Sequence, residues 1–122
     1  MPLRLFAAAA LAALSAPVLA GASVTIGLAV TGDMERKLAT YACEGHDPLI
    51  VEYLNAAPNF LALVPVGDQT LIFVNVISAS GAKYESGSYV WWTKGNDATL
   101  HDITEGLDAA PVLTCSEQVD TP

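Results

Sequence analysis

Two polar residues that could act together, Ser80 and Lys94, lie in short turns on either side of an aromatic segment. Gly81 and Gly95 follow them, and glycine allows a backbone to turn through positive φ at little steric cost. A serine and a lysine can serve as nucleophile and base, but this requires a buried lysine with a lowered pKa. Lys94 lies between Thr93 and Gly95 in a polar turn, which predicts an exposed, charged ammonium. The pattern therefore favours a hydroxyl and an ammonium displayed to a partner.

The remaining polar residues indicate no metal or cofactor. His46 and His101 each precede an aspartate, but neighbouring residues of a strand point to opposite faces, so neither pair forms a catalytic dyad. We interpret both as structural or surface histidines. The acidic residues lack the spacing of a calcium loop, and there is no zinc signature or glycine-rich phosphate loop.

The segment between the two turns should form the strand that positions them. Ser88–Thr93 is rich in aromatic and β-branched residues, and alternation sends Trp91 and Trp92 to opposite faces. One tryptophan should face the core, and the other should be a half-buried cross-strand partner. Lys94 then lies just past the end of a stiff strand, and Ser80 lies in the turn before its hairpin partner, Ala82–Glu85.

The rest of the chain has the same pattern of short strands, one every 8–12 residues, and no window with a convincing helical period. Only Asp102–Leu107 could form a helical turn. We expect an all-β fold, a small antiparallel β-barrel of about eight strands whose lumen is packed with side chains. The remaining predicted strands are Leu38–Cys43, Leu49–Asn55, Asn59–Val66, Gln69–Ser78, Asp97–His101 and Val112–Gln118.

Several connections are predicted from composition. Residues 44–48 (E-G-H-D-P) read as a turn, and residues 34–38 as a connection or strand entry. Gly67 and Asp68 form a hairpin link, and Pro65 suggests an edge position or a bulge near the end of the preceding strand.

The N-terminus has the features of a secretory signal peptide. Arg4 precedes an unbroken apolar run over residues 5–14, and small residues lead to a cleavage site after Ala20. The apolar run is too short to span a bilayer. We therefore divide the chain into a cleaved signal peptide (1–20), a leader or first strand (21–37) and a barrel domain (38–122). Position 22 is alanine, so the N-terminal cysteine of a bacterial lipoprotein is missing, which predicts a periplasmic or secreted protein without a membrane anchor.

Cys43 and Cys115 are the only cysteines, and in an exported chain they most simply form one disulfide. Two cysteines without a CxxC spacing and with scattered histidines argue against a metal site. The closed loop would hold about 70 residues, and the chain-entropy account assigns such a loop about 4 kcal/mol of stability.

The mature chain is strongly acidic. Removal of Arg4 with the signal peptide leaves four Lys and Arg against 13 Asp and Glu, a net charge of −9. Nucleic acid is excluded as a partner because phosphates would be repelled. An acidic field would speed encounter with a basic macromolecule, although an acidic surface also simply keeps an exported protein soluble.

Five features occur together in the sequence: Y-A-C-E-G at 41–45, V-E-Y-L-N at 51–55, S-A-S-G-A-K-Y at 78–84, W-W-T-K-G-N-D-A-T-L at 91–100, and Cys115. Over about residues 38–118 they resemble one known family, the MliC/PliC inhibitors of c-type lysozyme. The resemblance implies an eight-stranded antiparallel barrel and, given Ala22, the periplasmic branch. It also implies that Ser80 and Lys94 enter the lysozyme cleft, flanked by Gly81, Ala82, Lys83, Tyr84, Thr93 and Gly95.

The leading hypothesis is therefore a lysozyme inhibitor with no enzymatic activity and no cofactor. The alternative is a barrel that carries a lipid or sugar in its lumen, which would need an open interior. A third hypothesis, a Ser–Lys hydrolase, would need turnover that depends on Ser80. The apolar stretches Gln69–Ser78 and Val24–Val30 could supply a homodimer edge, or could equally be core.

Overall fold

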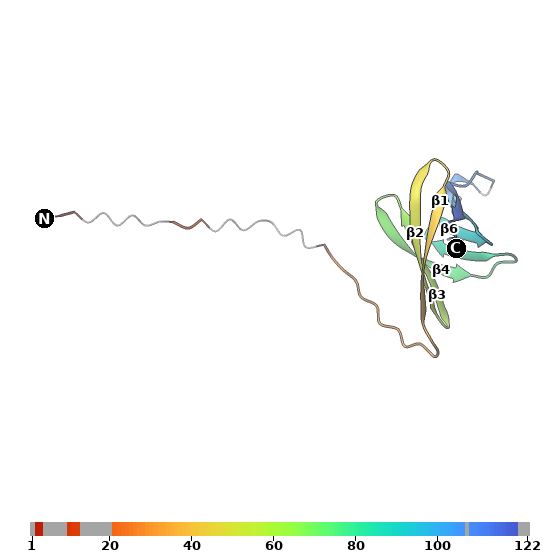
Figure 1. Cartoon of the computed structure of the whole chain (residues 1–122), viewed down its shortest axis with the longest axis horizontal. Helices are drawn as coiled ribbons and strands as arrows, with labels where there is room; N and C mark the ends of the chain where they lie inside the picture. Colours follow the sequence, from red (N-terminus) through yellow and green to blue (C-terminus); the bar gives the residue numbers. More distant parts are fainter. Residues whose placement is uncertain (1, 4–9, 13–20, 107, 120–122) are drawn as a thin grey trace.

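The computed structural model describes residues 2–3, 10–12, 21–106 and 108–119 of the chain. The predicted signal peptide falls mostly outside these residues. Residues 21–34 contain no helix or strand, so a first strand there is not seen (Figure 1). They form an extended segment that leads into the barrel, and the Thr31 hydroxyl donates to the Ala57 carbonyl at 3.3 Å. Among the described residues, no helix has the length and apolarity needed to cross a membrane.

Eight strands form one closed antiparallel barrel in which each strand pairs with its sequence neighbours and β1 pairs with β8 (Figure 1). The predicted all-β barrel is confirmed. A short 3₁₀ helix, Ile103–Glu105, occupies the one place where a helical turn was expected. The strands are β1 (Glu35–Cys43), β2 (His46–Ala56), β3 (Asn59–Val66), β4 (Gln69–Val76), β5 (Ala82–Ser86), β6 (Tyr89–Lys94), β7 (Asp97–Asp102) and β8 (Leu113–Glu117).

At the first hairpin the predicted turn over residues 44–48 was wrong, and both strands begin three residues earlier than predicted. The turn between β1 and β2 contains only Glu44 and Gly45, with Gly45 at φ +64°, so His46 to Pro48 already belong to β2. β1 begins at Glu35, within the stretch interpreted as a connection or strand entry, and the second of these alternatives is confirmed. Its charged residues fit a strand because Arg36 pairs with Glu52 of β2 across the sheet.

The β3–β4 hairpin forms as predicted around Gly67 and Asp68. Pro65 pairs with Thr70 on the β4 side, whereas the β2 pairing of β3 ends at Leu63. The side of Pro65 that faces β2 is therefore unpaired, and the missing N–H of proline removes no ladder hydrogen bond there. β4 ends at Val76, two residues earlier than predicted, because β5 pairs with it only from Val74 to Val76.

Side chains fill the interior of the barrel, as the sequence predicted. The largest fully buried side chains are Trp91, Phe73, Leu100, Val51 and Val64. Alternation places Trp91 inside, whereas Trp92 is partly exposed on the outer face. A carrier needs an open lumen, so these buried side chains argue against the carrier hypothesis.

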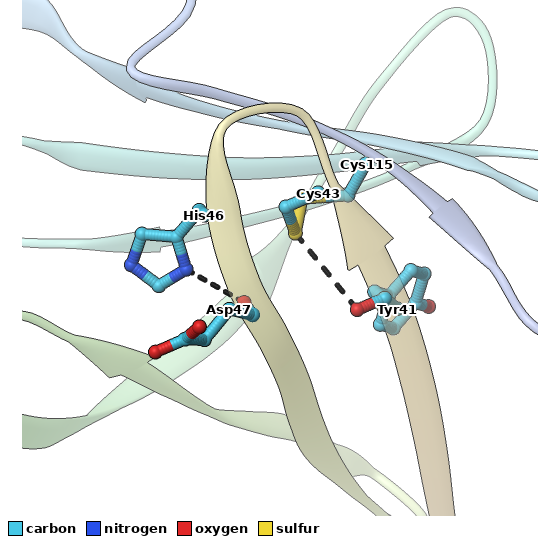
Figure 2. Close-up of a disulfide and its surroundings, with 5 residues drawn as sticks. All are labelled: Tyr41, Cys43, His46, Asp47 and Cys115. Atoms are coloured by element: carbon cyan, nitrogen blue, oxygen red, sulfur yellow. Dashed lines mark hydrogen bonds between the residues drawn. A yellow bond between two sulfur atoms is a disulfide. The ribbon is translucent and has the colours of Figure 1, made fainter.

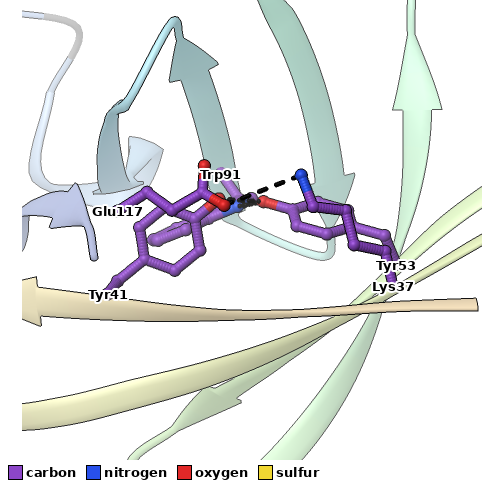
Figure 3. Close-up of polar contacts among 5 residues, drawn as sticks. All are labelled: Lys37, Tyr41, Tyr53, Trp91 and Glu117. Atoms are coloured by element: carbon purple, nitrogen blue, oxygen red, sulfur yellow. Dashed lines mark hydrogen bonds and ion pairs between the residues drawn. The ribbon is translucent and has the colours of Figure 1, made fainter. Parts of the chain in front are cut away.

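A buried chain of hydrogen bonds joins three of the interior aromatic residues (Figure 3). The indole N–H of Trp91 donates to the Tyr53 hydroxyl at 2.9 Å, and the hydroxyls of Tyr53 and Tyr41 lie 2.7 Å apart. The Tyr41 ring also meets Trp91 edge-on, with ring centroids 5.2 Å apart. Burial raises the pKa of Tyr41 and of Tyr53 above the ordinary tyrosine value, so both hydroxyls are protonated at neutral pH.

The predicted disulfide between Cys43 and Cys115 is present and joins the end of β1 to the middle of β8, beside the β1–β2 turn (Figure 2). The two cysteines are register partners with a Cα–Cα distance of 4.0 Å. Because β1 and β8 are the first and last strands, this bond fastens the seam at which the barrel closes.

Candidate functional site

Ser80 and Lys94 lie at the same end of the barrel. Lys94 is the last residue of β6, and Ser80 belongs to the loop that leads into β5. In the β5–β6 register Ala82 faces Thr93, which brings the residues just before β5 beside the residues just after Thr93. Ser80 and Lys94 are both exposed to solvent. The hydroxyl and the ammonium are therefore presented on neighbouring bends, as the sequence predicted.

Direct packing holds these two bends together. Gly81 has φ +65°, and a Cβ built on it would lie 2.1 Å from the Thr93 carbonyl oxygen and 2.8 Å from Lys94 Cγ. Only glycine permits so close an approach, because any side chain would overlap the neighbouring backbone. The Thr93 hydroxyl also donates to the Ala82 carbonyl at 3.3 Å.

The Ser80 carbonyl is anchored by two further donors. The indole N–H of Trp92 donates to it at 2.9 Å, and the Ser78 hydroxyl donates to it at 2.7 Å. The loop from Ile77 to Gly81 lies outside the sheet ladder, so these bonds take the place of strand pairing. They fix the backbone from which the Ser80 side chain projects.

Lys94 is held by an aromatic ring. Its ammonium nitrogen lies 4.0 Å from the centroid of the Trp92 ring, a cation–π distance, and the Lys83 ammonium lies 5.2 Å from the same centroid. The other two cations of the described barrel are in ion pairs, Arg36 with Glu52 and Lys37 with Glu117. The two lysines near the bends, Lys83 and Lys94, therefore both lie over the Trp92 ring, and Lys94 is the one that is exposed to solvent.

The remaining predicted site residues support the bends from the barrel side. Tyr84 is buried, and its ring packs against Tyr53 at a centroid distance of 5.7 Å. Thr93 and Gly95 line a polar pocket at the mouth of the barrel, into which Tyr41, Tyr53 and Tyr84 also face. Ala82 is partly buried against the core.

The two histidines lie on different strands, His46 on β2 and His101 on β7. His46 is exposed and contacts the carbonyl of its neighbour Asp47 through Nδ1 at 2.7 Å (Figure 2). His101 contacts the Thr99 hydroxyl through Nε2 at 2.8 Å. Burial, and secondarily the charge of Lys83, lower the pKa of His101, so it is neutral at pH 7. No group of three or more His, Cys, Asp or Glu side chains with metal-binding geometry occurs among the described residues.

Sequence reasoning missed the connecting role of Trp92. One of the two tryptophans was expected to be a half-buried cross-strand partner, and Trp92 is that residue, since it pairs with Lys83 and Thr99. The signal was present, because residues two apart on a strand share a face, and Trp92 precedes Lys94 by two. Its bond to Ser80 could not be inferred, because it depends on the path of a loop from another strand.

The fold and the site define a small β-barrel binding domain that presents two adjacent bends at one end. The chain belongs to the MliC family: the family model described as "Membrane-bound lysozyme-inhibitor of c-type lysozyme" matches residues 41–108. This confirms the resemblance seen in the sequence.

Relatives with the name "Membrane-bound lysozyme inhibitor of C-type lysozyme" occur in several bacteria. The protein from Pseudomonas aeruginosa is 47% identical over 94 residues, covering 75% of this chain and 74% of its own. The protein from Cupriavidus necator is 36% identical over 107 residues, covering 88% and 86%. A solved structure, described as Pseudomonas aeruginosa MliC in complex with hen egg white lysozyme, is 42% identical with a TM-score of 0.63, covering 80% of this chain and all of that one.

Proposed function

We propose that this chain is an exported inhibitor of c-type lysozyme, and that Ser80 and Lys94 enter the active-site cleft of the enzyme. The observation that carries the proposal is the placement of these two exposed side chains on bends that pack against each other at one end of a rigid barrel. The relatives named as lysozyme inhibitors, and the related structure solved with hen egg white lysozyme, support the same partner.

The chemistry of the two side chains suits that cleft. A lysozyme is a glycosidase whose two carboxyl groups flank the bond to be cut. An ammonium and a hydroxyl placed between these groups can donate charge-assisted hydrogen bonds to both, where the sugar would otherwise lie. Inhibition is then competitive. Gly81, Ala82 and Gly95 keep the bends narrow, while Lys83, Tyr84 and Thr93 flank and support them.

Charge and compartment fit this partner. The mature net charge of −9 attracts a basic lysozyme and raises the rate of encounter at low ionic strength. Ala22 stands where a lipoprotein carries its acylated cysteine, which supports the proposal that the chain acts in the periplasm without a lipid anchor. No metal or cofactor is needed for inhibition by occupation of a cleft.

The two competing hypotheses fit the structure less well. A lumen carrier needs an open interior, whereas Trp91, Phe73 and Leu100 fill this one. A Ser–Lys hydrolase needs a buried lysine as its base, whereas Lys94 is exposed and its ammonium lies over Trp92.

The test is inhibition of hen lysozyme acting on bacterial cell walls by the parent, Ser80→Ala and Lys94→Ala. Loss of one member of a desolvated polar pair commonly costs 2–5 kcal/mol, so we expect inhibition to weaken by about 30- to several-thousand-fold. Ser86→Ala, at the far end of β5, and Arg36→Ala, which removes one positive charge elsewhere, are matched controls and should inhibit like the parent. Full inhibition by both site variants would refute insertion.

A further inference from the structure

Trp92 contacts both of the bends that the proposed function depends on. Its indole N–H donates to the Ser80 carbonyl at 2.9 Å, and its ring lies under the Lys94 ammonium at 4.0 Å. Ser80 and Lys94 lie in different connections of the barrel and are 14 positions apart in the sequence. Trp92 is therefore one side chain that links the backbone of one bend to the cation of the other.

Without such contacts, both groups would be loosely held. The Ser80 loop lies outside the sheet ladder, and Lys94 has a long flexible side chain that makes no ion pair among the described residues. Ordering a rotamer-rich side chain at an interface costs about 0.5–1.5 kcal/mol, or roughly two- to twelvefold in affinity. A contact that already orders the side chain in the free protein removes this cost from binding.

We infer that Trp92 is a positioning residue for lysozyme binding, which orders Ser80 and Lys94 before the partner arrives. This inference rests on the proposed function and adds the means by which the two donors are held. Trp92 acts through these two groups. Removal of Trp92 should therefore weaken inhibition when the Ser80 and Lys94 side chains are present, and should have less effect when either has been removed.

Two substitutions separate the two contacts. Trp92→Leu removes both the donor and the ring, and should weaken inhibition roughly tenfold, the cost of ordering one side chain and one loop. Trp92→Phe keeps an aromatic face for Lys94 but loses the N–H, and should weaken inhibition only about threefold. Ile72→Ala, an outward truncation on β4 at a half-exposed site, is the control and should inhibit like the parent.

Double variants test whether Trp92 acts through the bends. In a Lys94→Ala background, Trp92→Leu should weaken inhibition by no more than roughly threefold, because only the contact of Trp92 with Ser80 is then left to lose. In a Ser80→Ala background, Trp92→Phe should cost nothing further. If Trp92→Leu costs the same tenfold with and without Lys94, Trp92 contacts lysozyme directly or acts only on stability, and the inference is overturned.

A measurement on the free protein makes the test independent of lysozyme. Ring currents from Trp92 should shift the Lys94 ε-methylene protons upfield in NMR spectra of the parent, and the shift should vanish in Trp92→Leu. An unshifted resonance in the parent would overturn the inference. The two proposals fail differently: if Ser80→Ala and Lys94→Ala inhibit fully, the proposed function fails, whereas if they lose inhibition but Trp92→Leu does not, only the role of Trp92 fails.

Discussion

Gly81 offers a sharp test of whether the two bends must stay in contact. The substitution Gly81→Ala adds one methyl group at φ +65°, where it would lie 2.1 Å from the Thr93 carbonyl oxygen and 2.8 Å from Lys94 Cγ. The lysine atom is on a flexible side chain and can move. The Thr93 oxygen belongs to the backbone of β6, so the two bends themselves must separate.

The magnitude follows from two terms. A non-glycine residue in the left-handed region costs about 1–2 kcal/mol in stability wherever it occurs. The overlap adds a displacement, because a Cβ at 2.1 Å must retreat by about 1 Å to reach the shortest distance that real Cβ atoms show. A binding constellation tolerates only about 0.5 Å of error. We therefore expect inhibition of lysozyme to weaken at least tenfold, or about 1.4 kcal/mol.

Gly87→Ala is the matched control. Gly87 has φ +56° in the β5–β6 turn, and a Cβ there would meet nothing within 4 Å. It carries the same conformational cost without the overlap, so it should lower the unfolding free energy by about 1–2 kcal/mol and leave inhibition unchanged. The assay is inhibition of cell-wall lysis by hen lysozyme, with denaturant unfolding of both variants. Equal inhibition by Gly81→Ala and Gly87→Ala would refute the reasoning.

Three further outcomes are expected. Raising the salt from about 50 to about 500 mM should slow association with lysozyme in stopped-flow measurements, because the attraction between the acidic chain and a basic lysozyme is screened, and an unchanged rate would exclude electrostatic steering. Replacing Cys43 and Cys115 by alanine should lower the free energy of unfolding by about 4 kcal/mol, and a loss below about 1 kcal/mol would show that the seam holds without the bond. The raised pKa values of Tyr41 and Tyr53 stabilise the fold fully below pH 10, and this contribution is lost as the pH rises further, since the unfolded chain releases those protons first. Stability should therefore fall above pH 10, with part of the tyrosine absorbance change delayed until unfolding. A normal titration of all four tyrosines would contradict this.

Much of the fold could be predicted because its strands are short, regular and punctuated by glycine turns. Gly67–Asp68 marked a hairpin, alternation sent Trp91 and Trp92 to opposite faces, and two cysteines behind a predicted signal peptide indicated a disulfide between them. The wrongly predicted strand boundaries have one cause: amino-acid composition does not show which residues of neighbouring strands pair with each other. His46 to Pro48 look like a turn, yet β2 begins at His46 because the two-residue turn at Gly45 already reverses the chain.

The candidate site was predictable in its residues but not in its contacts. Ser80 and Lys94 were identified by type, turn and family motif. Their contact through Gly81 and Trp92 depends on the β5–β6 register and on the path of the β4–β5 loop, which are tertiary features. The homodimer stays a prediction, and its strongest support is the half-exposed outward face of β4 at Ile72 and Val74.

The central claim, that the two bends occupy the catalytic cleft, is tested most directly by competition. The affinity of the chain for hen lysozyme would be measured by calorimetry at increasing concentrations of a short chitooligosaccharide that fills the cleft. We predict that the apparent Kd rises linearly with the saccharide concentration, because the two ligands exclude each other. An unchanged Kd at saturating saccharide, with both ligands bound at once, would contradict the account.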